Sequence, residues 1–407
     1  MTPNAPSKKA VLFIFITMLI DTIGFGLILP VMPALIVDLT GEGLSAASIY
    51  GGWLWFAYAV MQFFFAPVLG NLSDRFGRRP VILFSLFALG LDYVVMGFAP
   101  TLGWLFAGRI VSGIAGATFS PATAYLADIS PPEKRAQNFG LLGAAFGVGF
   151  ILGPAIGGLL GTLGPRAPFF AAALLALVNV AFGFFVLPES LAPANRRTFN
   201  LKRSNPLGTL LQMRKYPAVY GLAAALLLFQ IGHQVLPSTW SFYTTIKFQW
   251  SSAAIGASLA AVGVIIAISQ GVLSRILIPR LKEWRTAVLA LIATLLCYLG
   301  YAFVTQGWMV YVCMSMWFFA ALAFPAINAL MSQQVPADAQ GELQGGVASL
   351  YSLSAIVGPP VMTQLLGYFS SDTAPVYFPG AAFVCAAVLT GVSIILFIRA
   401  TSAHRAE

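Results

Sequence analysis

The chain has 407 residues, of which 59% are hydrophobic and only 9% are charged, and its mean hydropathy is +0.86. Soluble domains carry about a quarter of their residues as charged side chains, so this balance excludes one and indicates a chain dissolved in lipid. The net charge of +9 would suggest a nucleic-acid partner in a soluble protein, but the cations here lie almost entirely in alternate loops, which instead indicates membrane topology.

Apolar stretches long enough to cross a bilayer follow one another along the chain. We count twelve, at roughly 10–36, 47–69, 79–98, 101–126, 138–161, 167–187, 217–245, 253–274, 286–304, 307–332, 343–368 and 376–399. One set of alternate loops holds nearly all of the lysines and arginines, whereas the other set holds only Arg166 and Lys247. By the positive-inside rule both termini are cytoplasmic, and the basic charge supports a lipid partner but no nucleic acid.

Three charged residues lie well inside these stretches, where each costs at least ~2.5 kcal/mol near the bilayer centre. They are Asp21, Asp92 and Arg109. Asp92 and Arg109 are equally far from the turn near Pro100, so they can meet as an ion pair that is either structural or part of proton coupling. Asp21 has no such partner, and burial favours the neutral form of a lone carboxyl group. We expect Asp21 to be the principal proton carrier, with a structural role as the alternative.

The polar loop after the second stretch combines glycines with charges of both signs. Its residues are Gly70, Asp74, Arg75, Gly77, Arg78 and Arg79. We expect Asp74 to sit just before the third span, where a carboxylate favours the positive helix end, and the arginines to bridge to a facing bundle. The loop would then act as a conformational latch. The alternative is an ordinary cytoplasmic loop, which would need neither the glycines nor the acid.

The fifth stretch is rich in glycine and carries a proline near its middle. The face runs from Gly143 and Gly147 to Gly161 and contains Gly149, Gly153, Pro154, Gly157 and Gly158. Small residues let a neighbouring backbone approach closely, and the proline kinks the helix. Close packing against another span is therefore expected.

Residues 188–216 form the one long polar interruption of the chain. We interpret this segment as a cytoplasmic linker between a bundle at 1–187 and a second bundle at 217–400, followed by a tail at 401–407. A shift of about half the chain length superposes Gly153-Pro154 on Gly358-Pro359, a parallel repeat typical of transporters. Two bundles that rock about a central site provide alternating access, whereas a duplication kept only for packing is the alternative.

The same shift compares the polar loop of the first half with its counterpart in the second half. There Arg275 and Lys282 replace the glycines and Pro279 replaces the acid. A latch is therefore expected on one side only.

Polar residues recur at helical spacing on the seventh stretch, at Gln230, His233 and Gln234. We expect this stripe to face a substrate cavity, although hydrogen bonding between helices is an equal alternative. Weaker candidates for the same cavity are Gln62, Thr118 and Asn328.

Motifs for other chemistry are absent from the sequence, which has no phosphate-binding Gly-Lys-Ser/Thr loop, no HExxH, no CxxC and no GxSxG. The three cysteines lie inside predicted spans, where they behave as small apolar side chains. We therefore predict no enzyme, no metal, no cofactor and no use of ATP.

Over residues 10–400 the chain resembles the twelve-span drug:proton antiporters of the major facilitator superfamily, and most closely their tetracycline-efflux group. The resemblance is carried by the loop at 70–79, by Gly149 to Gly158, and by Leu187-Pro-Glu-Ser190. It implies an all-α integral membrane fold of two six-helix bundles, and transport roles for the residues matching Asp21, Asp92 and Arg109. One departure stands out, because the His and Asp of the group's eighth and ninth spans align with Ile266 and Thr294.

The sequence thus predicts a proton-coupled exporter of amphipathic organic compounds in a bacterial inner membrane, acting as a monomer. A metabolite uptake symporter on the same fold, tetracycline efflux proper and a non-transporting membrane receptor are the alternatives. Without a ligating group at Ile266 or Thr294, we expect a magnesium-tetracycline complex to be a poor substrate.

Overall fold

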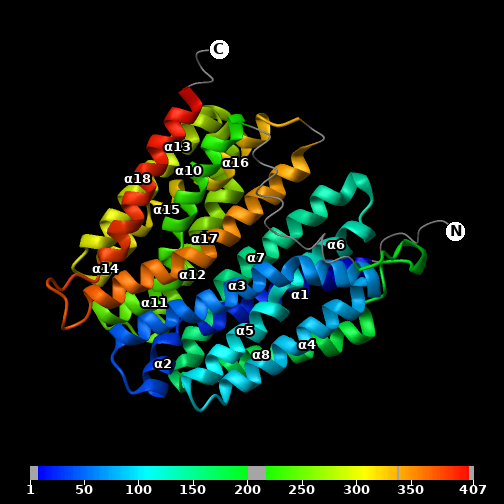
Figure 1. Cartoon of the computed structure of the whole chain (residues 1–407), viewed down its shortest axis with the longest axis horizontal. Coiled ribbons are helices and arrows are strands. Elements are labelled where there is room, and N and C mark those ends of the chain that lie inside the picture. The colour runs from blue at the N-terminus through cyan, green and yellow to red at the C-terminus, as the bar shows by residue number, and fades with distance from the viewer. Residues whose placement is uncertain (1–7, 200–216, 337–338, 403–407) are drawn as a thin grey trace. The chain divides into compact units, whose positions relative to one another are not determined.

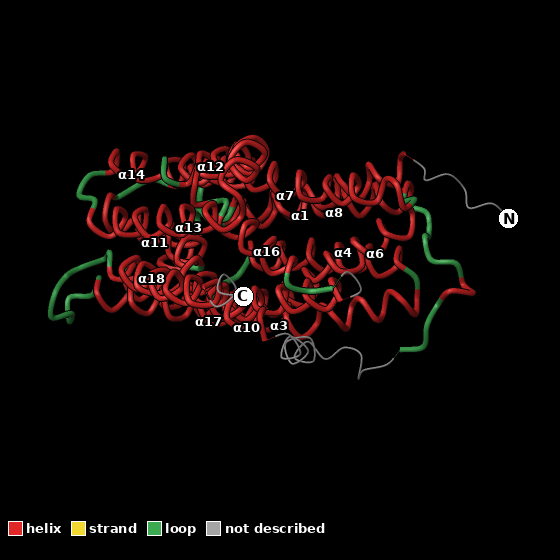
Figure 2. Tube along the Cα trace, turned by 90° about the horizontal axis from the view of Figure 1, so that it is seen from above, coloured by secondary structure: helices red, strands yellow, loops and turns green. Residues whose placement is uncertain are grey.

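The computed structural model describes residues 8–199, 217–336 and 339–402, and these ranges contain helices and no strand (Figures 1 and 2). Within these described ranges, eleven apolar helical segments are long enough to cross a membrane, and the longest, Ser252–Phe303, has 52 residues. It is divided at Lys282, whose φ of 63° and ψ of 164° are not helical. A single crossing needs about 20 residues, so this segment supplies two crossings and the predicted total of twelve is confirmed.

The first half of the chain contributes the following elements: α1 (Lys8–Ile28), α2 (Met32–Thr40), α3 (Leu44–Phe76), α4 (Arg78–Gly97), α5 (Leu102–Ala115), η1 (Gly116–Thr118), α6 (Phe119–Ile129), α7 (Pro132–Leu160), η2 (Gly161–Leu163), α8 (Ala167–Val186) and η3 (Pro193–Asn195). The first and fourth spans are each interrupted, at residues 29–31 and at η1. Pro30 lies in the first interruption, where its ring and missing N–H disfavour a continuous helix.

The second half contributes α10 (Pro217–His233), α11 (Val235–Phe248), α12 (Ser252–Ile268), the π-helical segment η6 (Ser269–Leu273), α13 (Ser274–Phe303), α14 (Gly307–Met314), α15 (Trp317–Ala320), α16 (Ala323–Gln333), α17 (Gln340–Phe369) and α18 (Ala381–Ser402). Its first and fourth spans are also interrupted, at Gln234 and between α14 and α16. Discontinuous helices at corresponding places in two halves are a feature of transporter folds. Most of the predicted linker, from residue 200 onward, and most of the tail lie outside the described residues.

The chain forms two compact units that exchange one short segment each. The first contains Met1–Thr40, Ala57–Asn205 and Ser251–Ala260, and the second contains Gly41–Phe56, Pro206–Trp250 and Ala261–Glu407. The start of α3 thus belongs with the second half, and the start of α12 with the first. Within the first unit α1 packs on α7 and α8, and within the second α10 packs on α17 and α18.

Glycines explain the exchange of segments. In the first unit a Cβ on Gly158 of α7 would lie 3.0 Å from the Cα of Gly256 on α12, and Gly256 in turn meets the carbonyl oxygen of Pro154. In the second unit Gly52 of α3 would meet the carbonyl oxygen of Pro359 on α17 at 3.2 Å. Each Gly-Pro pair of the predicted repeat therefore receives a glycine of an exchanged segment, so the two pairs have equivalent packing roles.

Large apolar side chains cover much of the outer surface of the helices. Phe84, Leu163 and Phe185 are 72%, 78% and 84% exposed. Such exposure is unfavourable in water and ordinary in contact with lipid tails. The surface therefore agrees with the membrane location expected from composition.

Candidate functional site

Asp21 lies in the C-terminal half of α1, and its Oδ1 atom is buried without a hydrogen-bond partner among the described residues. A buried polar atom without a partner is costly, and the cost is larger for a carboxylate than for a neutral carboxyl group. The side chain is thus placed where gain or loss of one proton changes the free energy of the site substantially. This is the chemical property that a proton carrier requires.

The helix that carries Asp21 is held by the glycines of α7. A Cβ on Gly149 would lie 2.6 Å from the Cβ of Thr22, and one on Gly153 would lie 2.8 Å from the carbonyl oxygen of Ile23. Gly157 continues the same face, against the backbone of Leu27. Close packing of this stretch on a neighbouring span, as predicted, is therefore present.

Part of the predicted glycine face is different. A Cβ added to Gly143 or to Gly147 would have no neighbouring atom within 4 Å, so these two glycines do not share the close approach of the later ones. The reason is the helical period: Gly149, Gly153 and Gly157 repeat every four residues and fall on one side of α7, whereas Gly143 and Gly147 do not continue that row.

Asp92 on α4 and Arg109 on α5 are both buried, but no ion pair joins them in the described chain, so the direct pair expected from their spacing is not formed. The Asp92 carboxylate instead accepts a hydrogen bond from the Ser112 hydroxyl. Arg109 places Nη2 3.1 Å from the sulfur of Met96. The two charges still attract each other at longer range.

The geometry of α5 explains why Ser112 replaces Arg109 as the partner of Asp92. A Cβ on Gly108 would lie 3.0 Å from Oδ1 of Asp92, so the missing side chain lets the carboxylate approach α5 directly. Ser112, one helical turn beyond Gly108, is then within reach. Arg109 points elsewhere, with its guanidinium carbon 5.9 Å from the ring centroid of Tyr58.

Tyr93 is a residue to which sequence reasoning assigned no role. It is 4% exposed, and a Cβ on Gly24 would lie 3.3 Å from its hydroxyl oxygen. Gly24 follows Asp21 by about one helical turn, so the Tyr93 hydroxyl lies close to the part of α1 that carries Asp21. In the sequence, the position of Tyr93 directly after Asp92 could have indicated that it lies near the charged residues. Tyr93 therefore places the part of α4 that carries Asp92 close to α1 near Asp21.

The predicted latch is a charge network within the first unit. Arg78 is 8% exposed, and its guanidinium pairs with Asp74 at 2.5 Å and with Asp128 at 3.1 Å. Its Nη1 also donates to the Ser73 hydroxyl at 2.6 Å. These contacts lie beside α3, α4 and α6, so the expected bridge from Arg78 to a facing bundle is replaced by bonds within its own unit.

The sequence placed Asp74 at the positive end of α4, and this expectation is wrong. The helix α3 continues to Phe76, so Asp74 lies in the last turn of α3. Glu189 occupies the positive end of α4 instead. The backbone N–H groups of Arg78 and Arg79 donate to its two carboxylate oxygens at 2.9 and 3.3 Å. An anion at a helix N-terminus is stabilised both by hydrogen bonds and by the helix dipole.

Gly77 and Gly70 have steric reasons for their places in this network. Gly77 has a φ of 108°, and a Cβ there would overlap the Glu189 carboxylate. A Cβ on Gly70 would lie 2.9 Å from the Ser120 hydroxyl oxygen.

The other two arginines of the loop bond elsewhere. Arg79 donates to the carbonyl oxygen of Phe184 at 2.7 Å, and Arg75 lies over the ring of Phe76.

Replacing Glu189 with glutamine should lower the stability of the protein by about 1 kcal/mol, because an amide removes the negative charge and turns an NH₂ group toward one of two backbone donors. Thermal unfolding of the purified protein in detergent would measure the loss. Glu283→Gln, which removes the same charge from α13, serves as the control. Equal unfolding temperatures for the two variants would contradict the role assigned to Glu189.

The polar stripe of the seventh span is packed into the second unit. Gln230 and Gln234 are each 4% exposed, and Nε2 of Gln234 lies 3.4 Å from the Ser354 hydroxyl. His233 forms a 3.1 Å hydrogen bond between Nδ1 and the Tyr298 hydroxyl. These contacts agree with the alternative in which the stripe makes hydrogen bonds between helices.

His233 is surrounded by a cluster of aromatic side chains. The sequence did not reveal this cluster, because its members are far apart in the chain. The imidazole stacks on Phe229 at 5.9 Å between ring centroids and meets Trp317 at 5.3 Å. Tyr298 contacts Trp317 and Phe383 in turn. The second unit therefore places a hydrogen-bonding imidazole among rings suited to flat apolar groups.

The weaker cavity candidates have local partners. The Thr118 hydroxyl is buried and donates to the Ala115 carbonyl at 2.9 Å. Gln62 donates to the Tyr58 hydroxyl at 3.1 Å, and Asn328 pairs with Gln344 at 3.4 Å. Gln62 and Thr118 belong to the first unit and Asn328 to the second.

No group of three or more His, Cys, Asp or Glu side chains in the described ranges could hold a metal ion.

Comparisons with known proteins agree with this architecture. The family model described as Major Facilitator Superfamily matches residues 14–359. The chain is 40% identical to the class C tetracycline resistance protein of Escherichia coli, over 94% of this chain and 95% of the relative. It is 39% identical to the class G protein of Vibrio anguillarum, over 85% and 87% of the two chains.

A solved structure gives the same result at the level of the fold. The crystal structure of the human organic anion transporter MFSD10 superposes with a TM-score of 0.70 and 25% identity, covering 97% of this chain and 100% of the other. The sequence match, the apolar helices and the equivalent Gly-Pro packing in two halves lead to one conclusion. The chain belongs to the Major Facilitator Superfamily and is a multi-pass membrane transporter of small molecules.

Proposed function

We propose that this protein exports amphipathic organic compounds across a bacterial inner membrane in exchange for protons. In this proposal both termini are cytoplasmic, the functional form is a monomer, and no cofactor takes part. The observation that carries it is the buried Oδ1 of Asp21, which has no hydrogen-bond partner in the described chain. A group in this position favours different structures with and without its proton.

The coupling step would operate through the helix that carries Asp21. Protonation removes a buried charge from α1, and α1 is fixed closely to α7 at Gly153 and Gly157. A change in the favoured position of α1 would therefore involve α7 and, through Gly158, the start of α12. This is a route by which one proton could bias two states of an alternating-access cycle.

Asp92, Arg109 and Tyr93 would modulate the same step. Tyr93 lies directly after Asp92 on α4, and its hydroxyl lies near Gly24, about one helical turn from Asp21, so a movement of α4 that follows a change of charge at Asp92 would act on the part of α1 that carries Asp21. We assign substrate contacts to Gln230, His233 and Gln234, with Gln62, Thr118 and Asn328 as further candidates. Their partners in this structure would have to be exchanged for substrate contacts during the cycle.

The substrate is proposed to be a neutral or cationic amphipathic compound. Thr294 is 0% exposed, and its hydroxyl donates to the Ala290 carbonyl at 2.8 Å, so it is engaged within its own helix. Ile266 carries no ligating atom. Neither position can bind a metal-chelated drug, while the rings around His233 provide stacking and cation–π surfaces.

Tetracycline efflux proper is the second candidate function. It is favoured by the names of the relatives, since the class C and class G tetracycline resistance proteins match this chain over most of its length. Both candidates use the same fold and the same proposed proton carrier. They differ in which compound is exported.

Expression in an efflux-deficient host distinguishes the two candidates. We expect resistance to a lipophilic dye or drug to rise more than resistance to tetracycline, and Gln234→Ala to weaken that resistance. Strong tetracycline resistance that survives alanine at Gln230, His233 and Gln234 together would support the second candidate. An uptake symporter would instead increase accumulation of its substrate when the exterior is acidic.

A further inference from the structure

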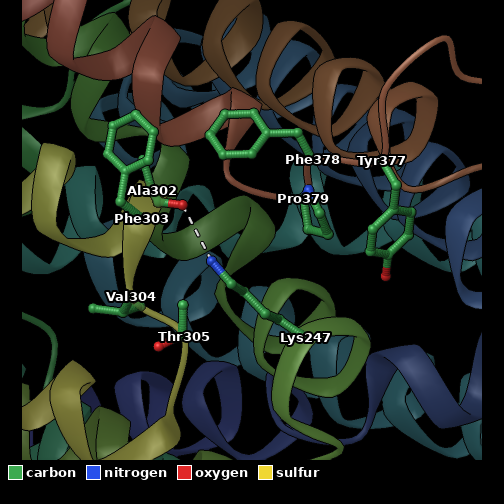
Figure 3. Close-up of a pocket in the computed structure, with 8 residues that line it drawn as sticks. All are labelled: Lys247, Ala302, Phe303, Val304, Thr305, Tyr377, Phe378 and Pro379. Carbon is green, nitrogen blue, oxygen red and sulfur yellow. Dashed lines mark hydrogen bonds between the residues drawn. The ribbon is translucent and has the colours of Figure 1, made fainter.

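A small cavity lies at the ends of three helices of the second unit, away from the residues discussed above. Its volume is about 290 Å³, and it is lined by Lys247, by residues 302–305 and by residues 377–379 (Figure 3). Lys247 is in the last turn of α11, Ala302 and Phe303 end α13, and Pro379 lies just before α18. Ends of membrane-spanning helices lie at the level of lipid head groups.

Lys247 is the one charged group among the residues that line this cavity. Its ammonium group donates to the Ala302 carbonyl at 3.1 Å and to the Tyr243 hydroxyl at 3.1 Å. Both acceptors are neutral, and no carboxylate forms an ion pair with Lys247 in the parts of the chain that the structure describes. An ammonium group has three N–H donors, and the two bonds of Lys247 use two of them. One donor is therefore left, and the half-buried positive charge has no counter-ion among the described residues.

The other walls of the cavity are apolar and aromatic. Figure 3 shows the ammonium group of Lys247 between the segment 302–305 and the segment 377–379. The rings of Phe303 and Phe378 lie 5.6 Å apart between centroids, and Phe303 and Tyr377 are 64% and 62% exposed. Exposed aromatic side chains at span ends are typical of the boundary between lipid and water.

We propose that this cavity binds the head group of an anionic phospholipid, with Lys247 contacting the phosphate and the exposed rings contacting the adjoining acyl region. The phosphate supplies the missing counter-ion, and the location at the ends of three spans matches the depth of a phosphate in a bilayer.

A purely structural role for Lys247 is the competing explanation, since lysines often bond the last carbonyls of a helix. Arg166 provides a matched control. Its Nη1 atom donates to the carbonyl oxygens of Gly97 and Ala99 at the end of α4, each at 2.9 Å. Both side chains therefore bond carbonyls at a span end, but Arg166 is not part of the cavity.

The test compares unfolding temperatures of the full-length protein in phosphatidylcholine nanodiscs with and without phosphatidylglycerol. The wild type should gain roughly 2 °C from the anionic lipid. Lys247→Gln should lose this gain. Arg166→Gln should unfold at a lower temperature than the wild type in both lipids, but should still gain stability from the anionic lipid. A full gain in Lys247→Gln would overturn the proposal.

Two further arms separate the source of the anion and guard against a variant that does not fold. Inorganic phosphate added to phosphatidylcholine nanodiscs should leave the unfolding temperature unchanged, and a shift as large as that from phosphatidylglycerol would overturn the assignment to a lipid. Phe378→Ala removes one wall of the cavity without touching the bonds of Lys247. Native mass spectrometry should show fewer retained phosphatidylglycerol molecules for this variant, and unchanged retention would also contradict the proposal.

Discussion

Asp21→Asn should abolish export against a gradient while leaving the protein folded and inserted. Asparagine has nearly the same size and hydrogen-bonding capacity as a protonated aspartate, but it cannot release a proton. The variant would therefore be fixed in the equivalent of the protonated state. Exchange of substrate between two equal pools does not require net proton movement, so we expect such exchange to survive.

The measurement is transport in proteoliposomes, with and without an imposed pH gradient. Asp38→Asn is the matched control, because Asp38 is an exposed carboxylate on the neighbouring helix α2 and its loss should leave uphill export near the wild-type rate. Uphill export by Asp21→Asn at the wild-type rate would show that another group carries the proton.

Gly157→Ala should destabilise the protein by about 1–3 kcal/mol, the usual cost of overpacking a tight interior. The added methyl group would lie 2.7 Å from the Cα of Leu27 and would also overlap its carbonyl group. These are backbone atoms of α1, so they cannot move aside as a flexible side chain can. We also expect slower transport, because the displaced helix carries Asp21.

Gly147→Ala on the same helix is the control, since a Cβ there has nothing within 4 Å. Alanine favours a helix over glycine by about 1 kcal/mol, so this change should be neutral or stabilising. Only Gly157→Ala should therefore lower the unfolding temperature. If both variants are equally stable, close packing of α7 on α1 is not important for the folded state.

The features predicted well from sequence depend on local properties of the chain. The twelve crossings follow from the length and apolarity of each segment, which neighbouring segments alter little. The close packing near Gly153 follows from a spacing of small residues that puts them on one helix face.

Features that depend on tertiary partners could not be predicted in the same way. Spacing brought Asp92 near Arg109 but could not show that Gly108 directs the carboxylate to Ser112. The role of Glu189 depends on the path by which the chain returns from α8 to the start of α4. Propensity and charge do not contain this information, although the segment Leu187-Pro-Glu-Ser190 is itself recognisable in the sequence.

The backbone at Lys282 shows a similar limit. The sequence shift aligns Lys282 with Gly77, and the loss of the glycines and of the acid predicts a latch in the first half only. The structure gives Lys282 a φ of 63°, so the positive φ is present although the glycine is not. The two halves therefore share the backbone geometry of the turn more closely than its residue type, at a cost of about 1–3 kcal/mol for a lysine in this region.

Proton movement in everted membrane vesicles tests the central claim most directly. Respiration acidifies the vesicle interior, which corresponds to the outside of the cell, and a pH-sensitive dye reports that acidity. The account predicts that adding a transported compound makes the interior less acidic in vesicles with the wild-type protein, because protons leave as the compound enters. It predicts no such change with Asp21→Asn. Compound uptake by wild-type vesicles without any loss of interior acidity would contradict proton-coupled export.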